Sequence, residues 1–208
     1  MAERYVITLG RECGAGATYI AQHLSKELGI PYYDKDIFRM VSDKSGVLEE
    51  FFHVNSERPG NNLLYKLVKD LKPADQKPSL GKDIVSPDNL FRFQSELIRE
   101  LADNESCIII GRCADYVLKD HDNCVHVFVC GDMDSKVQRM MHSYSLEESA
   151  AVERIKETDK LRKKYYSYYT GGDWEAASNY DLCLNTGTMT IEEAAEQILF
   201  YLKQKKYI

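Results

Sequence analysis

A glycine-rich turn between an apolar run and an amphipathic segment is the feature that most constrains this chain of 208 residues. The turn Gly10-Arg11-Glu12-Cys13-Gly14-Ala15-Gly16-Ala17-Thr18 follows the apolar run Tyr5–Leu9 and precedes an amphipathic stretch from Ile20 to Leu28. In the order strand, glycine-rich turn and helix, backbone N–H groups and the positive end of the helix face a bound anion. The turn therefore predicts a phosphate-binding loop in an α/β fold.

The loop departs from the G-x-x-x-x-G-K-[ST] template at two positions. Gly16 and Thr18 fit the template, whereas Arg11 replaces its first glycine and Ala17 replaces its lysine. Because the template lysine reaches the phosphates of the nucleotide, this loop predicts a cradle without its usual cation. Glycine-rich turns between a strand and a helix are common in α/β domains, so the loop alone leaves a purely structural turn open.

Further apolar runs predict a parallel sheet. The segments Cys107–Ile110, Val125–Cys130 and Tyr180–Leu184 have the length of buried strands, and Ile30–Tyr33 is a weaker fifth candidate. A stretch with helical character follows each run. Strands that alternate with helices favour a layered α/β fold with right-handed crossovers.

Capping residues predict where three helices begin. Ser86-Pro87-Asp88 has the pattern of an N-cap followed by proline in the first turn, and Ser145–Glu148 and Thr190–Glu193 have the pattern of capping boxes. The stretch from about residue 56 to 86 is rich in Pro, Lys, Asp and Asn and is expected to be exposed. We expect one domain, residues 1–208, with an insertion before the Ser86 helix and a charged helix after Ser145.

Composition narrows the classes of partner. A net charge of −6 argues against a nucleic-acid binder, and no apolar run has the length of about 20 residues that a membrane span needs. We expect no membrane association and, without the pattern of a signal peptide, a cytoplasmic protein. No cysteine pair has zinc-site spacing, so reduced core thiols are expected at Cys107, Cys124, Cys130 and Cys183, while a helix N-terminus is expected to lower the pKa of Cys13.

Polar residues follow several predicted strands at the edge where open parallel sheets bind ligands. Asp34 follows the Ile30–Tyr33 segment, and Arg112 follows Cys107–Ile110 and Gly111. The planar guanidinium of Arg112 suits a bidentate grip on phosphate, although a surface arginine is the alternative. The charged helix after Ser145 is either a lid that brings cations over a phosphoryl group or a solvated helix, and its spacing favours the solvated helix. Packing is the expected role of the tyrosines from Tyr165 to Tyr169.

The chain resembles the cytidylate kinase-like family of P-loop proteins, which are relatives of the nucleoside monophosphate kinases. The stretches that carry the resemblance are ITLGRECGAGATYIAQHLSKELGIPYYDKDIF, FRFQSELIRELADNESCIIIGRCADYVL and YYSYYTGGDWEAASNYDLCLNT, and residues 46–85 are unmatched. The resemblance implies a P-loop NTPase three-layer fold, with a five-stranded parallel sheet flanked by helices. It also implies a substrate flap at about residues 35–86 and a helical lid at about residues 145–175.

The resemblance also implies a set of site residues. The nucleotide and phosphate are expected on Arg11, Gly14, Ala15, Gly16, Ala17 and Thr18, and the acceptor on Asp34, Arg39 and Arg112. The lid is expected to contribute Arg139, Asp159, Lys160 and Arg162, and the catalytic cations are expected to be Arg11, Arg112 and Arg162. Thr18 and Glu12 are the candidates for holding Mg²⁺. Ile110 replaces the acidic residue of true cytidylate kinases, and Thr158 replaces a lid arginine.

Three functions are open on these residues. The first is an ATP- and Mg²⁺-dependent phosphotransferase acting on a small nucleotide or another phosphate-bearing acceptor, with CMP or dCMP as the default. The second, favoured by Ala17 and Ile110, is a degenerate P-loop module that binds a nucleotide or phosphate and regulates without efficient turnover. The third is a kinase of a non-nucleotide metabolite, for which the unmatched segment leaves room. A homodimer through Phe51-Phe52 or the tyrosines is also open.

Overall fold

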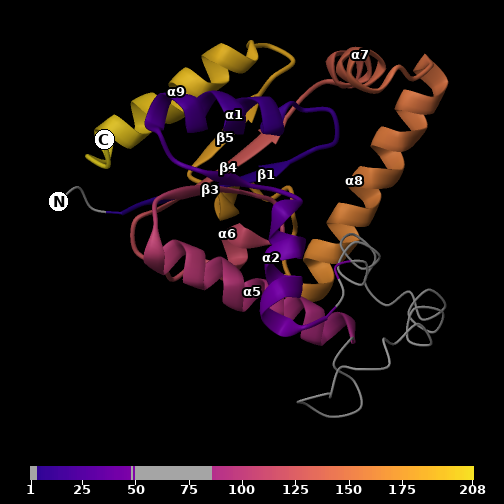
Figure 1. Cartoon of the computed structure of the whole chain (residues 1–208). Coiled ribbons are helices and arrows are strands. Elements are labelled where there is room, and N and C mark those ends of the chain that lie inside the picture. The colour runs from indigo at the N-terminus through magenta and orange to yellow at the C-terminus, as the bar shows by residue number, and fades with distance from the viewer. Residues whose placement is uncertain (1–3, 48, 50–85) are drawn as a thin grey trace.

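Five parallel strands form one central sheet in the computed structural model, which describes residues 4–47, 49 and 86–208. The strands lie in the order β2-β3-β1-β4-β5, so β1 is central and pairs with β3 on one side and β4 on the other (Figure 1). This arrangement confirms the predicted parallel sheet. The bounds are β1 Val6–Arg11, β2 Tyr32–Tyr33, β3 Cys107–Ile110, β4 Cys124–Cys130 and β5 Leu182–Asn185.

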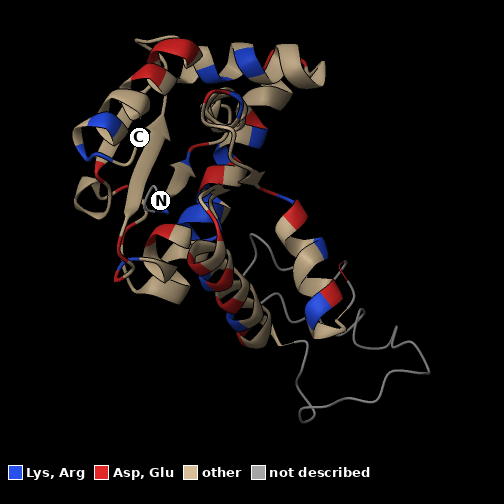
Figure 2. Cartoon of the chain, turned by 60° about the vertical axis from the view of Figure 1, so that its left-hand side comes forward, with Lys and Arg blue, Asp and Glu red and all other residues tan. Residues whose placement is uncertain are grey.

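Helices cover both faces of the sheet and its carboxyl edge. Helices α1 and α9 pack on one face, α2, α5 and α6 lie on the other, and α7 and α8 stand beside the edge where the strands end (Figure 1). Acidic and basic positions, coloured on the ribbon in Figure 2, are interspersed along the helices. The bounds are α1 Ala17–Leu28, α2 Asp36–Ser45, α5 Pro87–Asn104, α6 Ala114–Val117, α7 Met133–Tyr144, α8 Glu148–Thr170, the short 3₁₀ helix η1 Ala177–Asn179 and α9 Ile191–Gln204.

Two apolar clusters hold these layers together. Ile7 and Leu9 of β1 point toward α1 and α9, where they pack with Ile20 and Ile198. Val6, which directly precedes Ile7, points the other way and packs in the opposite cluster, formed with α2 and α5. Because both faces of the parallel sheet are buried, its strands read as continuous apolar runs rather than as alternating ones.

The helix starts test the capping predictions. Ser86 accepts a hydrogen bond from the Asn89 N–H at 3.2 Å, and Thr190 forms the reciprocal capping box with Glu193, as predicted. The predicted box at Ser145 is wrong. Ser145 ends α7 in the left-handed conformation (φ 52°), which differs from the extended backbone typical of an N-cap. Glu147, which is extended, takes the N-cap position of α8 instead.

Other expectations have mixed outcomes. Cys107 is buried as predicted, but Cys183 is exposed, because it alternates outward on the edge strand β5. Tyr165 and Tyr166 are buried with Trp174, which confirms packing as their role.

Some expectations concern residues outside the described part of the chain. These are the exposed segment predicted at residues 56–86, apart from Ser86, most of the flap, and Phe51-Phe52. Within residues 4–47, 49 and 86–208, no helix combines the length and apolarity needed to cross a membrane.

His126 joins the two central strands and gives the fold a pH dependence. Its Nδ1 lies 2.8 Å from the Thr8 hydroxyl, and burial lowers its pKa against the opposing effect of Asp115 and Asp181. The unfolded chain therefore binds the proton first, so the stability that this histidine contributes is present above about pH 6.5 and is lost as the pH falls. We expect the melting temperature to drop less between pH 7.5 and pH 5.5 in His126→Gln than in the wild type. An equal drop in both proteins would contradict this expectation.

Candidate functional site

The glycine-rich loop connects β1 to α1 at the carboxyl edge of the sheet, as predicted. Gly14 and Gly16 have positive φ angles of 79° and 86°, a conformation that side chains disfavour. Gly16 is the N-cap of α1, so the positive end of this helix opens at the loop. Ala17 is 2% exposed, and its methyl group packs in the core where the template has a lysine. The loop thus has the backbone geometry of an anion cradle but no lysine of its own.

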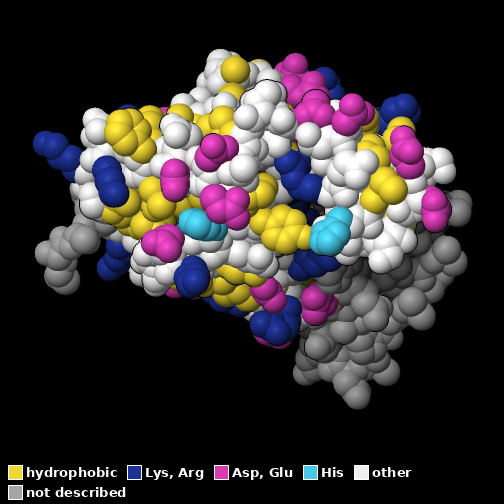
Figure 3. Space-filling view, turned by 90° about the horizontal axis from the view of Figure 1, so that it is seen from above, with side chains coloured by type: hydrophobic (Ala, Val, Ile, Leu, Met, Phe, Trp, Pro, Cys, Tyr) yellow, Lys and Arg dark blue, Asp and Glu magenta, His cyan; other side chains and the backbone are white. Residues whose placement is uncertain are grey.

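A cavity of about 520 Å³ opens against this loop. Its size falls in the range of small-molecule sites. Among the described lining residues, arginines from four parts of the chain and Lys35 are basic, and Glu12 and Asp34 are acidic. This lining has a positive balance suited to a polyanion. Figure 3 shows basic side chains in a recess of the face seen from above. The lining arginines are Arg11, Arg112, Arg139, Arg154 and Arg162.

Arg11 and Arg112 meet at the carboxylate of Asp34. Their Nη2 atoms lie 3.7 Å and 4.0 Å, respectively, from the same Asp34 oxygen, Oδ1. The guanidinium of Arg112 also stacks on the ring of Phe38 at 3.9 Å. Gly111 lies under Arg11, since a Cβ at position 111 would fall 1.6 Å from Arg11 Nη1. The structure therefore brings together three of the predicted site residues next to the ends of β1, β2 and β3.

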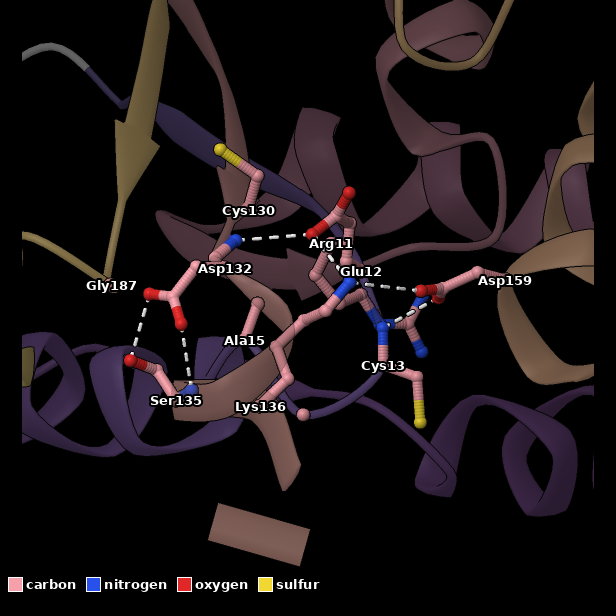
Figure 4. Close-up of polar contacts among 12 residues, drawn as sticks. Arg11, Glu12, Cys13, Ala15, Cys130, Asp132, Ser135, Lys136, Asp159 and Gly187 are labelled. Atoms are coloured by element: carbon pink, nitrogen blue, oxygen red, sulfur yellow. Dashed lines mark hydrogen bonds and ion pairs between the residues drawn. The ribbon is translucent and has the colours of Figure 1, made fainter. Parts of the chain in front are cut away.

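A second cluster, not predicted from the sequence, fixes the other side of the loop. Lys136 of α7 places Nζ 2.9 Å from Oε2 of Glu12 and 3.5 Å from Oδ2 of Asp159 (Figure 4). The Lys136 side chain is 7% exposed. Burial alone would lower the pKa of this ammonium group, but the carboxylates of Glu12 and Asp159 raise it above its ordinary value. Lys136 thus remains charged and ties the loop, α7 and α8 together.

The charged helix α8 touches the loop directly. Asp159 accepts a hydrogen bond from the Cys13 N–H at 2.6 Å, and Arg162 donates to the carbonyl oxygen of Arg11 at 3.2 Å. Arg154, Thr158 and Arg162 recur every fourth residue and line the cavity from one face of the helix. The spacing-based preference for a merely solvated helix is therefore wrong for this face, while Lys160 is exposed and does not line the cavity.

Arg139 and Arg39 differ in their relation to the cavity. Arg139 donates to the carbonyl oxygens of Gly14, at 2.8 Å, and Thr186, and it therefore braces the loop against the end of β5. Arg39 is 66% exposed, pairs with Asp36 at 3.9 Å and is absent from the described lining. Sequence reasoning did not assign Arg154 or Lys136 to the site. The fourfold spacing of Arg154 with Thr158 and Arg162 was an available signal, whereas no local pattern marks Lys136.

Cys13 is not an activated thiol in this structure. It is buried, and burial raises the pKa of its thiol, although Arg162 opposes the effect. The expectation that the helix N-terminus would lower this pKa is therefore wrong, because the desolvation cost outweighs the favourable charges. Cys13 serves the loop through its N–H group and its apolar packing with Val137 and Met140.

The two residues predicted to hold magnesium differ in their fit. Thr18 lines the cavity at the start of α1. Glu12 lines it too, but its Oε2 already accepts hydrogen bonds from Lys136 and from the Gly131 N–H at 3.0 Å. In the described part of the chain, no three His, Cys, Asp or Glu side chains are grouped to hold a metal. The Thr18 hydroxyl is the donor that fits, with nucleotide phosphates as further ligands.

The sequence profile of the cytidylate kinase-like family matches residues 6–188. A cytidylate kinase from Methanobrevibacter smithii is 24% identical over 199 residues, which cover 95% of this chain and 98% of that enzyme. A uronate isomerase from Corynebacterium glutamicum is 30% identical over 96 residues, but these cover 44% of this chain and only 18% of that enzyme's length.

Solved structures share the fold of this chain. An uncharacterized protein from Eubacterium ventriosum matches with a TM-score of 0.69 and 26% identity, covering 96% of this chain and 99% of that one. A shikimate kinase from Bacteroides thetaiotaomicron matches with a TM-score of 0.54 and 14% identity, covering 96% and 98% of the two chains, which shows the fold of a P-loop kinase. Since the family profile spans most of the sequence, the chain belongs to the cytidylate kinase-like family.

Proposed function

We propose that this protein is an ATP-dependent phosphotransferase whose acceptor is a nucleoside monophosphate, with CMP or dCMP as the first candidates. The observation that carries the proposal is the convergence of five arginines on a cavity whose floor is the glycine-rich loop. The family assignment and the full-length similarity to a cytidylate kinase support the same reaction class. Neither of these identifies the acceptor, which is therefore the part of the proposal that needs an experiment.

The arrangement suits phosphoryl transfer, which asks the protein for alignment and charge rather than for covalent chemistry. The N–H groups around Gly14 and Gly16 and the N-terminus of α1 would hold the donor phosphates. Arg154 and Arg162 reach the cavity from α8 and would supply the positive charge that Ala17 lacks. Mg²⁺ held by Thr18 and the nucleotide would neutralise further phosphate charge.

Arg112→Gln tests the acceptor half of the site. Removal of one well-placed charged donor is expected to lower kcat/KM on the order of 100-fold. The measurement is ADP release from ATP and Mg²⁺ with CMP, dCMP, the other nucleoside monophosphates and shikimate as acceptors. Lys119→Gln is the matched control, because Lys119 is an exposed cation that lies over the Tyr116 ring and outside the cavity lining.

The pattern of acceptors decides the substrate class. Turnover with CMP or dCMP that is lost in Arg112→Gln and kept in Lys119→Gln would support the proposal. Turnover with shikimate alone would move the acceptor to a non-nucleotide metabolite. Equal rates in Arg112→Gln and the wild type would contradict the role of Arg112.

A nucleotide-binding module without efficient turnover is the second candidate. Two observations favour it: Ala17 leaves the loop without its lysine, and the Cys13 N–H is already bonded to Asp159 at 2.6 Å. A phosphate that used this N–H group would have to displace the Asp159 carboxylate. This candidate predicts that ADP and ATP bind in calorimetry while no acceptor of the panel releases ADP.

A further inference from the structure

We infer that Arg11, which stands at the first glycine position of the loop template, binds the anionic group of the acceptor together with Arg112, and does not replace the missing loop lysine. The inference rests on the proposed phosphotransferase function and assigns one of its specificity residues. The anionic group bound is a phosphate monoester or a carboxylate, which carries less charge. Its basis is the direction of the Arg11 side chain.

The guanidinium of Arg11 lies away from the donor half of the loop. A Cβ on Gly111 would fall 1.6 Å from Arg11 Nη1 and 2.7 Å from its Cζ, so the group lies over the end of β3. Its Nη2 is 3.7 Å from Asp34, which follows β2. In the strand order β2-β3-β1-β4-β5, the Arg11 guanidinium therefore lies on the β2 and β3 side of the loop. On the opposite side, toward β5, Arg139 donates to the carbonyl oxygens of Gly14 and Thr186.

The chain after β3 is shaped to present Arg112 beside Arg11. Gly111, Arg112 and Cys113 have successive positive φ angles of 70°, 61° and 53°. Two of the three are not glycine, and a side chain disfavours this left-handed conformation. Such strain persists where the surroundings impose it and gathers at functional sites. Here the turn keeps position 111 free of a side chain for Arg11 and directs Arg112 onto Phe38.

The charges of this cluster favour a bound anion. Two guanidiniums share one Asp34 oxygen, and the exposed fractions of the Arg11, Arg112 and Asp34 side chains are 16%, 7% and 23%. The distances of 3.7 Å and 4.0 Å exceed those of a charge-assisted hydrogen bond, about 2.7–2.9 Å. Asp34 holds the two planar groups side by side through these longer contacts, and the oxygens of one phosphate match such a pair.

The experiment separates donor from acceptor binding without requiring turnover. ADP is titrated into the protein by calorimetry, and CMP, orthophosphate and shikimate are then titrated into the ADP-saturated protein. Arg11→Gln is expected to weaken CMP or orthophosphate binding about 10- to 100-fold, the effect of losing one hydrogen-bonded charge, and to leave the ADP dissociation constant within about twofold. Arg11→Lys keeps the charge but loses the two-pronged guanidinium, so its acceptor affinity is expected to lie between those of the wild type and Arg11→Gln.

Gly111→Ala provides a second variant that keeps every charge. Its methyl group would displace the Arg11 guanidinium, so the same loss of acceptor binding is expected with ADP binding intact. Lys119→Gln is the control for loss of a cation elsewhere. The wild type could bind shikimate and neither CMP nor orthophosphate. If Arg11→Gln then lost shikimate binding, the result would support anion binding by Arg11 and Arg112 with a carboxylate acceptor.

Two results would overturn the inference. One is weaker ADP binding in Arg11→Gln with unchanged acceptor binding, which would assign Arg11 to the donor phosphates as a substitute for the loop lysine. The other is a wild-type protein that binds none of the three acceptor probes. If ADP itself failed to bind, the proposed function would be contradicted, and the same titrations on the protein alone would still decide whether Arg11 binds an anion.

Discussion

Replacing Lys136 by methionine is expected to lower the free energy of unfolding by about 3 kcal/mol, the effect of removing one partner of a buried ion pair. Methionine keeps most of the volume of the side chain, so the loss comes from the charge. It would leave the carboxylates of Glu12 and Asp159 facing each other without the ammonium group that lies 2.9 Å and 3.5 Å from them. Urea unfolding at pH 7 measures the change.

Lys163→Met is the matched control. Lys163 also contacts two carboxylates, Glu175 at 2.6 Å and Asp173 at 3.7 Å, but its side chain is 51% exposed. An exposed pair contributes between zero and about 1 kcal/mol, so a much smaller loss is expected. An equal decrease in the free energy of unfolding in the two variants would show that burial does not determine how much the Lys136 ion pairs stabilise the protein.

The same substitution is expected to weaken nucleotide binding. The Glu12 carboxylate lines the cavity beside the phosphate cradle, and Lys136 neutralises part of its charge. Without the lysine, two carboxylates would repel the donor phosphates, and Asp159 would lose part of what holds it against the Cys13 N–H. We expect the ADP dissociation constant to rise at least tenfold in Lys136→Met and to stay unchanged in Lys163→Met. Unchanged ADP binding in both would limit Lys136 to a structural role.

The fold was predictable because its strongest signals are local. Buried parallel strands must be apolar throughout, so Cys107–Ile110 stands out in the sequence with the bounds that the structure gives it. The glycine-rich turn marks the loop because the positive φ angles at Gly14 and Gly16 strongly favour a residue without a side chain. The capping box predicted at Ser145 was wrong for a related reason. A capping pattern predicts a helix start, but it does not show that the same serine ends the preceding helix, α7.

The candidate site was only partly predictable because its electrostatics are nonlocal. Lys136 lies 124 residues from Glu12 in the sequence, and nothing near it distinguishes it from a surface lysine. The acceptor role of Arg39 stays a prediction: Arg39 lies on an exposed face and pairs with Asp36, a placement that its sequence neighbours do not reveal. Arg112 was found because it directly follows a buried strand, where the topology of the sheet fixes its position.

The site divides into two halves that meet at β1. On one side, Asp34, Gly111 and Arg112 form the surroundings of the Arg11 side chain. On the other, α7 and α8 hold the backbone of the loop through Lys136 and Asp159. Arg11 belongs to both, since its side chain joins the first half and its carbonyl oxygen accepts from Arg162 in the second. An acceptor bound at the Arg11 side chain would therefore lie one residue away from a backbone contact that positions α8.

Gly14→Ala is expected to abolish tight nucleotide binding while the protein still folds. A Cβ at position 14 would lie 2.9 Å from the carbonyl oxygen of Lys136, a backbone atom of α7 that cannot turn aside, and φ at this position is 79°. The loop must therefore shift, and its N–H groups would lose their alignment toward the phosphates. We expect ADP affinity to fall about 10- to 100-fold, equivalent to one or two lost charged hydrogen bonds.

Gly29→Ala separates the clash from the backbone strain. Gly29 ends α1 with a φ of 65°, and a Cβ there would meet nothing within 4 Å. Both variants therefore bear the cost of a left-handed alanine, roughly 1–2 kcal/mol of stability, but only Gly14→Ala pushes the loop away from α7. Calorimetry with ADP and thermal unfolding of both variants measure the two effects. Wild-type ADP affinity in Gly14→Ala would show that the loop does not cradle the nucleotide, whereas weakened binding in both variants would trace the loss to strain in α1.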